Sequence, residues 1–221
     1  MNIDLLCQCP ICHGMPENQR KEFLENLRYE LRHFEKGNMI ARQEDPVNAL
    51  YILLKGSVKT EMINESGQLM HIENIRAPRP LAPAFLFAER NRFPVDVTAL
   101  EPTDILLIEK EEVIRQLAVN PYFMQSFLKF NSNRTQFLTD KLQLMSIKTI
   151  KGKLAFYLLS KSKESNDTVQ LDRTQTELAE YFAVARPSLA RTIAELEEEN
   201  LIRYEKKTIR ILDRNGLQKL L

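Results

Sequence analysis

The sequence predicts an α+β chain, with an N-terminal antiparallel β-roll, a long helix, and a small C-terminal domain of helices and a β-hairpin. Short β-prone runs separated by turn residues extend to about residue 108. A helical period then persists from Pro121 to about Ser146. Residues 174–191 then predict two short helices, and residues 201–212 a hairpin. The domains expected from this pattern are 1–120, 121–146 and 147–221.

Composition places the chain among globular proteins. Its 221 residues are 43% hydrophobic and carry a formal net charge of +1. That is enough apolar material for a core, but no charge excess that would itself indicate a nucleic-acid partner. No apolar run approaches the roughly 18 residues of a membrane helix, and the N-terminal MNIDLLCQCP lacks the pattern of a signal peptide. We therefore expect a cytoplasmic protein with no membrane partner.

All the cysteines, Cys7, Cys9 and Cys12, lie near the N-terminus and are followed by His13. An odd number of closely spaced thiols in a cytoplasmic chain argues against a disulfide framework. Three thiolates and an imidazole could hold zinc or an iron–sulfur cluster, which leaves a metal site open. The alternative, which we favour, is a mobile N-terminal tail with incidental thiols.

The N-terminal part begins with a predicted helix from Pro16 to about Arg32, after which the pattern becomes that of short strands. A turn is expected at Asn64–Gly67, and a proline-rich loop at Ala77–Pro83 interrupts the strands. The predicted strands are Met39–Ala41, Leu50–Leu54, Val58–Ile63, Leu69–Ile75, Phe93–Leu100 and Asp104–Ile108. Short strands with regular turns predict an antiparallel barrel or roll.

The long helix carries two largely apolar stripes. One recurs at alternating steps of four and three residues, the spacing of a coiled-coil seam: Met124, Leu128, Asn131, Thr135, Leu138, Leu142 and Met145. The other is Phe123, Phe127, Phe130, Arg134, Phe137, Lys141 and Leu144. We expect one stripe to face its own roll and the first stripe to face the same helix of a second subunit, giving an isologous dimer. A monomer that buries both stripes is the alternative.

Residues 174–191 read as two helices joined by a tight turn. Thr174 and Glu177 form a capping box, which predicts a helix start. Ala183 is small enough for a sharp turn, and Pro187 suits the first turn of the second helix. An ordinary helical hairpin with solvated arginines is the alternative. The predicted hairpin behind the pair has Lys206 and Lys207 at its tip, which favours a winged helix-turn-helix that binds DNA.

The chain resembles the CRP/FNR superfamily of bacterial transcription regulators over nearly its whole length. The N-terminal part is similar to the cyclic-nucleotide-binding roll through Phe34, Lys36-Gly37, Ile40, Glu44-Asp45, Leu50-Tyr51-Ile52, Gly56 and Val58-Lys59. The C-terminal part is similar to the family's winged helix through residues 185–191. The resemblance implies a homodimer on a near-palindromic double-stranded operator, with a recognition helix in each major groove and a contact to RNA polymerase.

Roles on DNA follow from chemistry and from this resemblance. Arg186 and Arg191 are expected to contact base edges or phosphates, because a guanidinium pairs bidentately with guanine. Ser188 can donate to a base or a phosphate, and Pro187 stands where many members of the family have an acidic residue. Backbone contacts, which fix register, are expected from Thr174, Gln175, Lys206 and Lys207.

The control domain departs from the family pattern. The cAMP-binding members hold ribose and phosphate with Gly-Glu and Arg-Ser or Arg-Thr pairs, where this chain has Ala82-Pro83 and Phe93-Pro94. Prolines remove amide donors and phenylalanine has no charge, so we do not expect cAMP binding. A family-type iron–sulfur cluster is not expected either, because the family uses four cysteines with wider spacing.

In these departures the chain is similar to the HcpR-like branch of the family. That branch responds to nitrosative stress and includes members associated with haem. Haem iron takes a His or Met axial ligand. The candidate axial ligands are Met62, Met70, His71 and Met145. With Phe85 and Phe93 they make up the candidate effector pocket. Each methionine can equally be core or seam packing. The alternatives are a pocket for another apolar ligand, or a roll that only supports dimerisation. The sequence has no G-x-S-x-G, H-E-x-x-H or P-loop, so we do not expect an enzyme.

Overall fold

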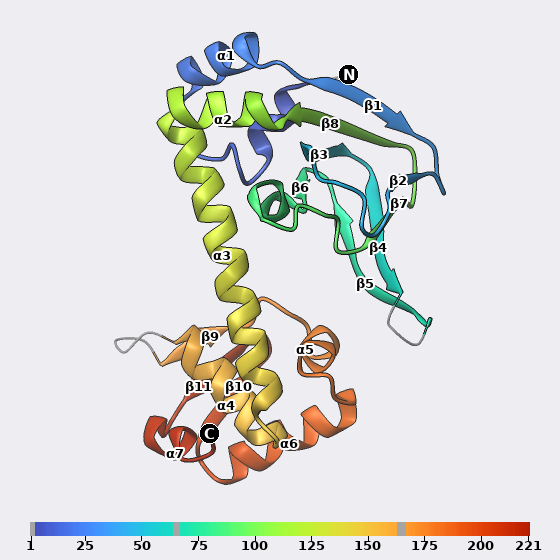
Figure 1. Ribbon diagram of the computed structural model, residues 1–221. Coiled ribbons are helices and arrows are strands. Elements are labelled where there is room, and N and C mark those ends of the chain that lie inside the picture. Colours follow the sequence, from blue (N-terminus) through green and yellow to red (C-terminus); the bar gives the residue numbers. More distant parts are fainter. Residues whose placement is uncertain (1–2, 64–66, 163–166) are drawn as a thin grey trace. The chain divides into compact units, whose positions relative to one another are not determined.

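The computed structural model describes residues 3–63, 67–162 and 167–221 (Figure 1). The chain divides into two compact units, Met1–Arg134 and Thr135–Leu221, and the boundary falls inside the long helix. Each unit has its own cluster of buried apolar side chains. No helix in the described part of the chain is both long enough and apolar enough to cross a membrane.

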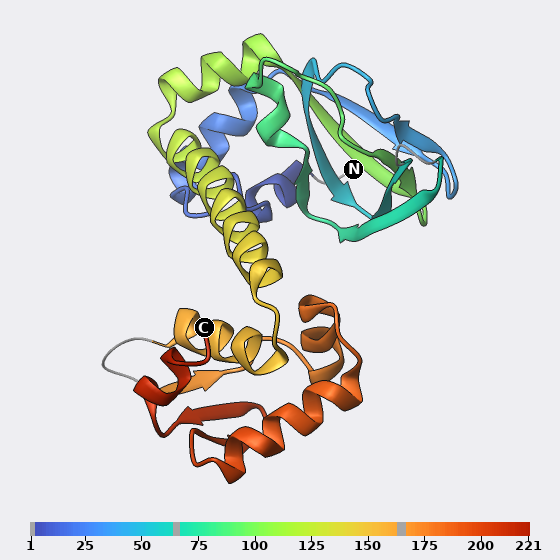
Figure 2. The same cartoon turned by 60° about the horizontal axis from the view of Figure 1, so that its bottom comes forward.

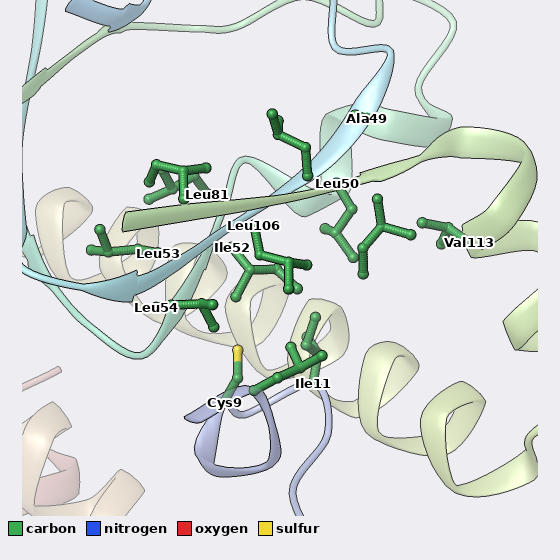
Figure 3. Close-up of a cluster of buried hydrophobic side chains, with 14 of the residues drawn as sticks. Cys9, Ile11, Ala49, Leu50, Ile52, Leu53, Leu54, Leu81, Leu106 and Val113 are labelled. Carbon is green, nitrogen blue, oxygen red and sulfur yellow. The ribbon is translucent and has the colours of Figure 1, made fainter. Parts of the chain in front are cut away.

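The N-terminal segment belongs to the core, so the prediction of a mobile tail is wrong. A 3-10 helix, η1 (Ile3–Gln8), is followed by a turn in which the amide of Cys12 donates to the carbonyl of Cys9 at 2.9 Å. Leu6, Cys9 and Ile11 are fully buried. Cys9 and Ile11 lie against apolar side chains of the β-roll (Figure 3). Burial of these apolar side chains gives the segment a fixed place.

The roll consists of two four-stranded antiparallel sheets, as predicted. The first has the order β1-β8-β3-β6, with β1 (Glu30–Phe34), β8 (Thr103–Glu109), β3 (Ala49–Lys55) and β6 (Arg79–Leu81). The second has the order β2-β7-β4-β5, with β2 (Met39–Ala41), β7 (Asp96–Ala99), β4 (Ser57–Ile63) and β5 (Leu69–Arg76). The central strands β3 and β8 are almost entirely buried, which places the core between the sheets and the helices.

Most predicted strands are confirmed, and three predictions need correction. The first helix, α1 (Glu17–Asn26), ends before the predicted Arg32, because Glu30–Phe34 pairs with β8 as β1. The proline-rich loop contains β6, which pairs with β3. The strand predicted over Phe93–Leu100 is shorter, because only Asp96–Ala99 joins the ladder. The predicted turn at residues 64–67 lies outside the described residues except for Gly67, whose φ is positive.

Close contacts explain why one position of the roll, Gly56, is a glycine. Gly56 joins β3 to β4 with φ +90°, and a Cβ there would lie 2.6 Å from the hydroxyl oxygen of Thr103 and 2.8 Å from the carbonyl oxygen of Pro102. A larger residue would therefore clash with a neighbouring strand as well as strain the backbone. The tight β3–β4 connection depends on this position.

Helix α3 (Pro121–Ser146) has the predicted bounds and follows α2 (Lys110–Val119), which the sequence analysis did not identify. One stripe of α3 packs on the chain itself, with Phe123, Phe127 and Leu144 buried. The other stripe faces solvent, and Leu128, Leu138, Leu142 and Met145 are 57, 49, 70 and 68% exposed. The burial of Phe123 and Phe127 in the core of the roll agrees with the prediction that one stripe faces the chain's own roll, whereas pairing of the exposed stripe with a second subunit stays a prediction.

The C-terminal unit begins with the end of α3 and continues with α4 (Ile150–Lys161) and β9 (Thr168–Gln170). The predicted helix pair follows as α5 (Gln175–Phe182) and α6 (Arg186–Glu198), joined by a short turn (Figure 2). The hairpin is β10 (Ile202–Glu205) and β11 (Thr208–Ile211), and α7 (Arg214–Gln218) closes the unit. The sheet order is β10-β11-β9.

Candidate nucleic-acid interface

The start of α5 is fixed by the predicted capping box. The backbone amide of Glu177 donates to the hydroxyl of Thr174 at 3.2 Å, and the amide of Thr174 donates to the Glu177 carboxylate at 2.7 Å. The Thr174 hydroxyl itself donates to this carboxylate at 2.9 Å. These bonds satisfy amide donors at the helix start, so the hydroxyl of Thr174 is already used within the protein.

The end of α5 is held by a left-handed residue and two lysines. Ala183 has φ 55°, which lets the chain turn into α6. Lys141 of α3 donates to the carbonyl of Tyr181 at 2.6 Å, and Lys153 of α4 donates to that of Phe182 at 2.9 Å. Cations at a helix C-terminus satisfy its last carbonyls and complement its dipole. Both lysines therefore help to orient the helix pair.

A polar cluster in front of α5 is a feature that sequence reasoning missed. Asp172 accepts from the hydroxyl of Tyr157 at 2.7 Å, from Lys161 at 3.0 Å and from Arg173 at 3.0 Å. Burial alone would raise the pKa of Asp172. The hydrogen bonds from Tyr157 and Lys161 and the charge of Arg173 outweigh this effect and lower the pKa to about 2. The ring of Tyr181 lies 4.3 Å from the ammonium of Lys141 and 4.7 Å from the guanidinium of Arg173. The residues come from several elements, so no pattern of residues adjacent in the sequence predicts the cluster.

Helix α6 presents a distinct outer face. Leu189, Ile193 and Leu196 are buried against the rest of the unit, and Thr192 is also buried. The exposed residues of the helix are Arg186, Pro187, Ser188, Ala190, Arg191, Ala194 and Glu198. Pro187 lies in the first turn, where its missing amide proton costs no hydrogen bond. The sequence analysis predicted Arg186, Ser188 and Arg191 on this face, and all of them are exposed.

Glu198 is the last residue of α6. The other two acidic residues of this helix, Glu195 and Glu197, bond to groups of the same unit. Glu195 pairs with Lys151 of α4 at 3.1 Å. Glu197 accepts from the backbone amide of Tyr204 at 2.7 Å. The outer face of the first two turns therefore carries cationic, small and apolar groups.

The hairpin has the predicted basic tip. Lys206 adopts φ 56° and is exposed, as is Lys207. Sequence reasoning missed a second pair of cations, Arg203 and Arg210, which are exposed and directly opposite each other in the β10–β11 ladder. Like charges opposite each other destabilise a sheet unless an anion lies near. The alternation of apolar and polar residues along the two predicted strands is the sequence signal that could have revealed this pair.

The predicted effector residues do not gather at one place. Met62 and Met70 are cross-strand partners in β4 and β5, and Met70 is 47% exposed. His71 is exposed on β5. Phe93 is only 1% exposed in the core. Phe85 is half-buried in the 3-10 helix η2 (Pro83–Phe87), and Met145 belongs to the C-terminal unit.

The positions expected to hold a cyclic phosphate are filled by the protein. Phe93 packs edge-on against Tyr51, with ring centroids 5.1 Å apart. Ala82 is left-handed and Pro83 begins η2. The arginines beside Phe93, Arg90 and Arg92, lie on the surface and donate to the carboxylate and the carbonyl of Glu44.

The cysteines do not fit a metal site. Burial raises the pKa of the Cys9 thiol to about 12, and burial with the neighbouring thiols raises that of Cys12 well above its usual range. Metals bind the thiolate, which these environments disfavour. Among the described residues, no three His, Cys, Asp or Glu side chains are arranged to hold a metal ion.

A helix-turn-helix with a basic wing, preceded by a β-roll and a long helix, defines a DNA-binding transcription regulator with an effector-binding domain. Comparison with known domain families agrees. The Crp-like helix-turn-helix domain matches residues 152–220, and the cyclic nucleotide-binding domain matches residues 31–120. The chain belongs to the CRP/FNR family of transcription regulators, which are not enzymes.

Individual relatives match most or part of the chain. The transcriptional regulatory protein btr of Bordetella pertussis is 26% identical over 214 residues, which cover 94% of this chain and 87% of btr. A transcriptional regulator from Thermotoga maritima is 32% identical and matches 58% of this chain and 98% of its own, with a TM-score of 0.53. The catabolite activator protein of Thermus thermophilus, 19% identical, has the same fold over 96% of this chain and 97% of its own, with a TM-score of 0.56.

Proposed function

We propose that the protein binds a near-palindromic operator as a homodimer and contacts RNA polymerase there. Arg186 and Arg191 carry the operator proposal, because both are exposed on the outer face of α6. Guanidinium groups there can reach guanine O6 and N7 in the major groove. Ser188 is placed for a base or phosphate, while Gln175, Lys206 and Lys207 fix register on the phosphates. Thr174 instead sets the start of α5, because its amide and its hydroxyl both donate to the Glu177 carboxylate.

The exposed stripe of α3 supports the dimer. Leucine and methionine side chains there remain largely in water within a single chain. Pairing two such stripes would bury them in an isologous seam, with Asn131 and Thr135 as its polar positions. Such a seam would carry two recognition helices, which is what a palindromic site requires.

We propose further that the β-roll responds to an effector other than cAMP. The buried Phe93 ring supports this proposal. The resemblance implies that it stands where the cAMP-binding members have their phosphate-binding arginine. A phosphate placed there would lose a cationic partner and meet an apolar ring. Isothermal titration of the full chain with cAMP should give no binding heat. Saturable binding with one site per chain would contradict the proposal.

A haem-mediated response to nitric oxide stays a prediction. The residues do not fit a haem well, because His71 and Met70 are exposed on an edge strand, Met145 lies in the other unit, and His33 is bonded to Asp104 at 2.7 Å. An absorption spectrum after addition of haemin tests it: a Soret band that shifts with nitric oxide would support a haem sensor, and its absence would remove it.

Operator binding is tested by selection from a random duplex library with the full-length protein. The expected result is an enriched sequence with two inverted half-sites, bound by two protomers. Enrichment of a single half-site bound by one protomer would contradict the dimer. Failure to enrich any sequence would contradict specific operator binding.

A further inference from the structure

The outer face of α6 has an unusual composition beside Arg191. Pro187 lies four residues before it and Ala194 three residues after it, so both are its neighbours on the helix surface. Ala190 is exposed next to them. Arg191 is the only charged residue within 187–194, all of which the structure describes. Its neighbours on the helix surface are the apolar Pro187 and Ala194 and the polar Ser188 and Glu195, and the Glu195 carboxylate pairs with Lys151.

This face also lacks a strong hydrogen-bond acceptor. Glu195 and Glu197 are held by Lys151 and by the amide of Tyr204. Over residues 186–194, which are all described, the only exposed side-chain acceptor is the hydroxyl of Ser188. Bases that show an amino group in the major groove, cytosine and adenine, are read by carboxylate or amide acceptors. The centre of the face cannot read them in this way.

We propose that Pro187, Ala190 and Ala194 read thymine methyl groups on either side of the guanine bound by Arg191. This inference rests on the proposed operator binding and specifies its sequence. An apolar side chain against the C5 methyl is the major-groove contact that distinguishes thymine without a hydrogen bond. One helix turn rises about 5.4 Å, and base pairs are about 3.4 Å apart. Pro187 and Ala194 therefore lie within one or two base steps of the base that Arg191 contacts.

A preference for thymine can come from a contact to its methyl group or from the shape of the DNA. A direct methyl contact is lost when thymine is replaced by deoxyuridine, which pairs identically but lacks the C5 methyl. Preference that comes from the deformability of A·T-rich DNA is largely independent of one methyl group. Substituting one thymine at a time therefore separates contact from shape.

The test uses the full-length protein and the duplex selected from the random library. Each thymine of one half-site is replaced in turn by deoxyuridine, and affinity is measured by fluorescence anisotropy. At one or two positions next to the guanine, we expect affinity to fall about fourfold, the equivalent of one methylene removed from an apolar contact. If every such replacement leaves affinity unchanged, the proposal is overturned.

The variant Pro187→Glu assigns the contact to a residue. Its carboxylate can accept from the amino group of cytosine, so selection with this variant should enrich cytosine where the wild type enriches thymine. The deoxyuridine penalty at that position should disappear. Glu198→Gln, exposed in the last turn of α6, is the matched control and should keep both the thymine and the penalty. A penalty that persists in Pro187→Glu would overturn the role of Pro187.

Failure of this inference can be told apart from failure of the proposed function. If the wild type enriches an inverted repeat and no methyl group matters, operator binding stands and only the methyl contact is wrong. If the wild type enriches no sequence, the operator proposal fails and the inference falls with it. A circular dichroism melt of each variant shows that it is folded.

Discussion

In the C-terminal unit, Arg186 and Arg191 are exposed on α6, whereas in the N-terminal unit Phe93 is buried in the core. The C-terminal unit presents these cationic side chains to solvent, where a ligand can reach them. The N-terminal unit encloses Phe93 in its own core. The two units have separate hydrophobic cores, so the core of the N-terminal unit can change without altering the exposed face of α6.

The largest expected effect comes from α3, which contributes to both units. Leu138→Glu places a charge in the exposed apolar stripe and should convert the dimer to a monomer. Loss of the second half-site contact should then weaken operator binding by at least about 100-fold. Light scattering and anisotropy measure the two effects.

The matched control for this variant is Gln143→Glu, which adds the same charge at an exposed position outside the stripe. It should remain dimeric and bind normally. A dimeric Leu138→Glu protein would show that the exposed stripe is not the seam, and DNA binding would then need another explanation for its symmetry.

The second prediction concerns the filled site of the N-terminal unit. Phe93→Ala should lower the free energy of unfolding of this unit by about 3–5 kcal/mol, because a fully buried ring leaves a cavity. Phe87→Ala, at a position 42% exposed, should cost much less. Hydrogen exchange resolves the two units. An equally small loss for both variants would mean that Phe93 lines an open site instead of filling the core.

The third prediction addresses the recognition helix. Arg186→Ala should cost about 1–3 kcal/mol of specific binding and relax discrimination at one base pair. Arg32→Ala, which removes an exposed arginine of the β-roll, should leave the operator affinity unchanged. Competition between the operator and single-base variants gives both quantities. Equal affinity and equal discrimination in Arg186→Ala would remove this residue from base recognition.

The smallest effect is a pH dependence confined to the N-terminal unit. The hydrogen bond to Asp104, at 2.7 Å, and the nearby carboxylate of Glu35 raise the pKa of His33 above its usual 6.5. The charged histidine is favoured in the folded state, so this stabilisation is fully present below pH 6.5 and is lost as the pH rises through the higher folded value.

His33→Gln should therefore flatten the dependence of the unfolding midpoint on pH above about 6.5. Asp104→Asn should flatten it as well, because it removes the partner that raises the pKa. The midpoint is measured by urea unfolding at a series of pH values. An undiminished slope in His33→Gln would assign the dependence to other groups.

The sequence predicted elements whose signal is local. The capping box at Thr174, the basic tip at Lys206 and the bounds of α3 follow from residues close together in the chain. Strand β1 and the burial of Cys9 did not follow, because both depend on packing against β8 and the roll, far away in sequence. The cluster of Asp172, Tyr157 and Tyr181 escaped for the same reason.

We expect the DNA-binding unit to read its operator without cAMP control. The most direct test is the affinity of the full-length protein for its selected operator, measured with and without millimolar cAMP. We predict the same dissociation constant in both conditions, because Phe93, which we propose replaces the phosphate-binding arginine of the family, is a buried apolar ring. A cAMP-dependent increase in affinity of tenfold or more would contradict the account.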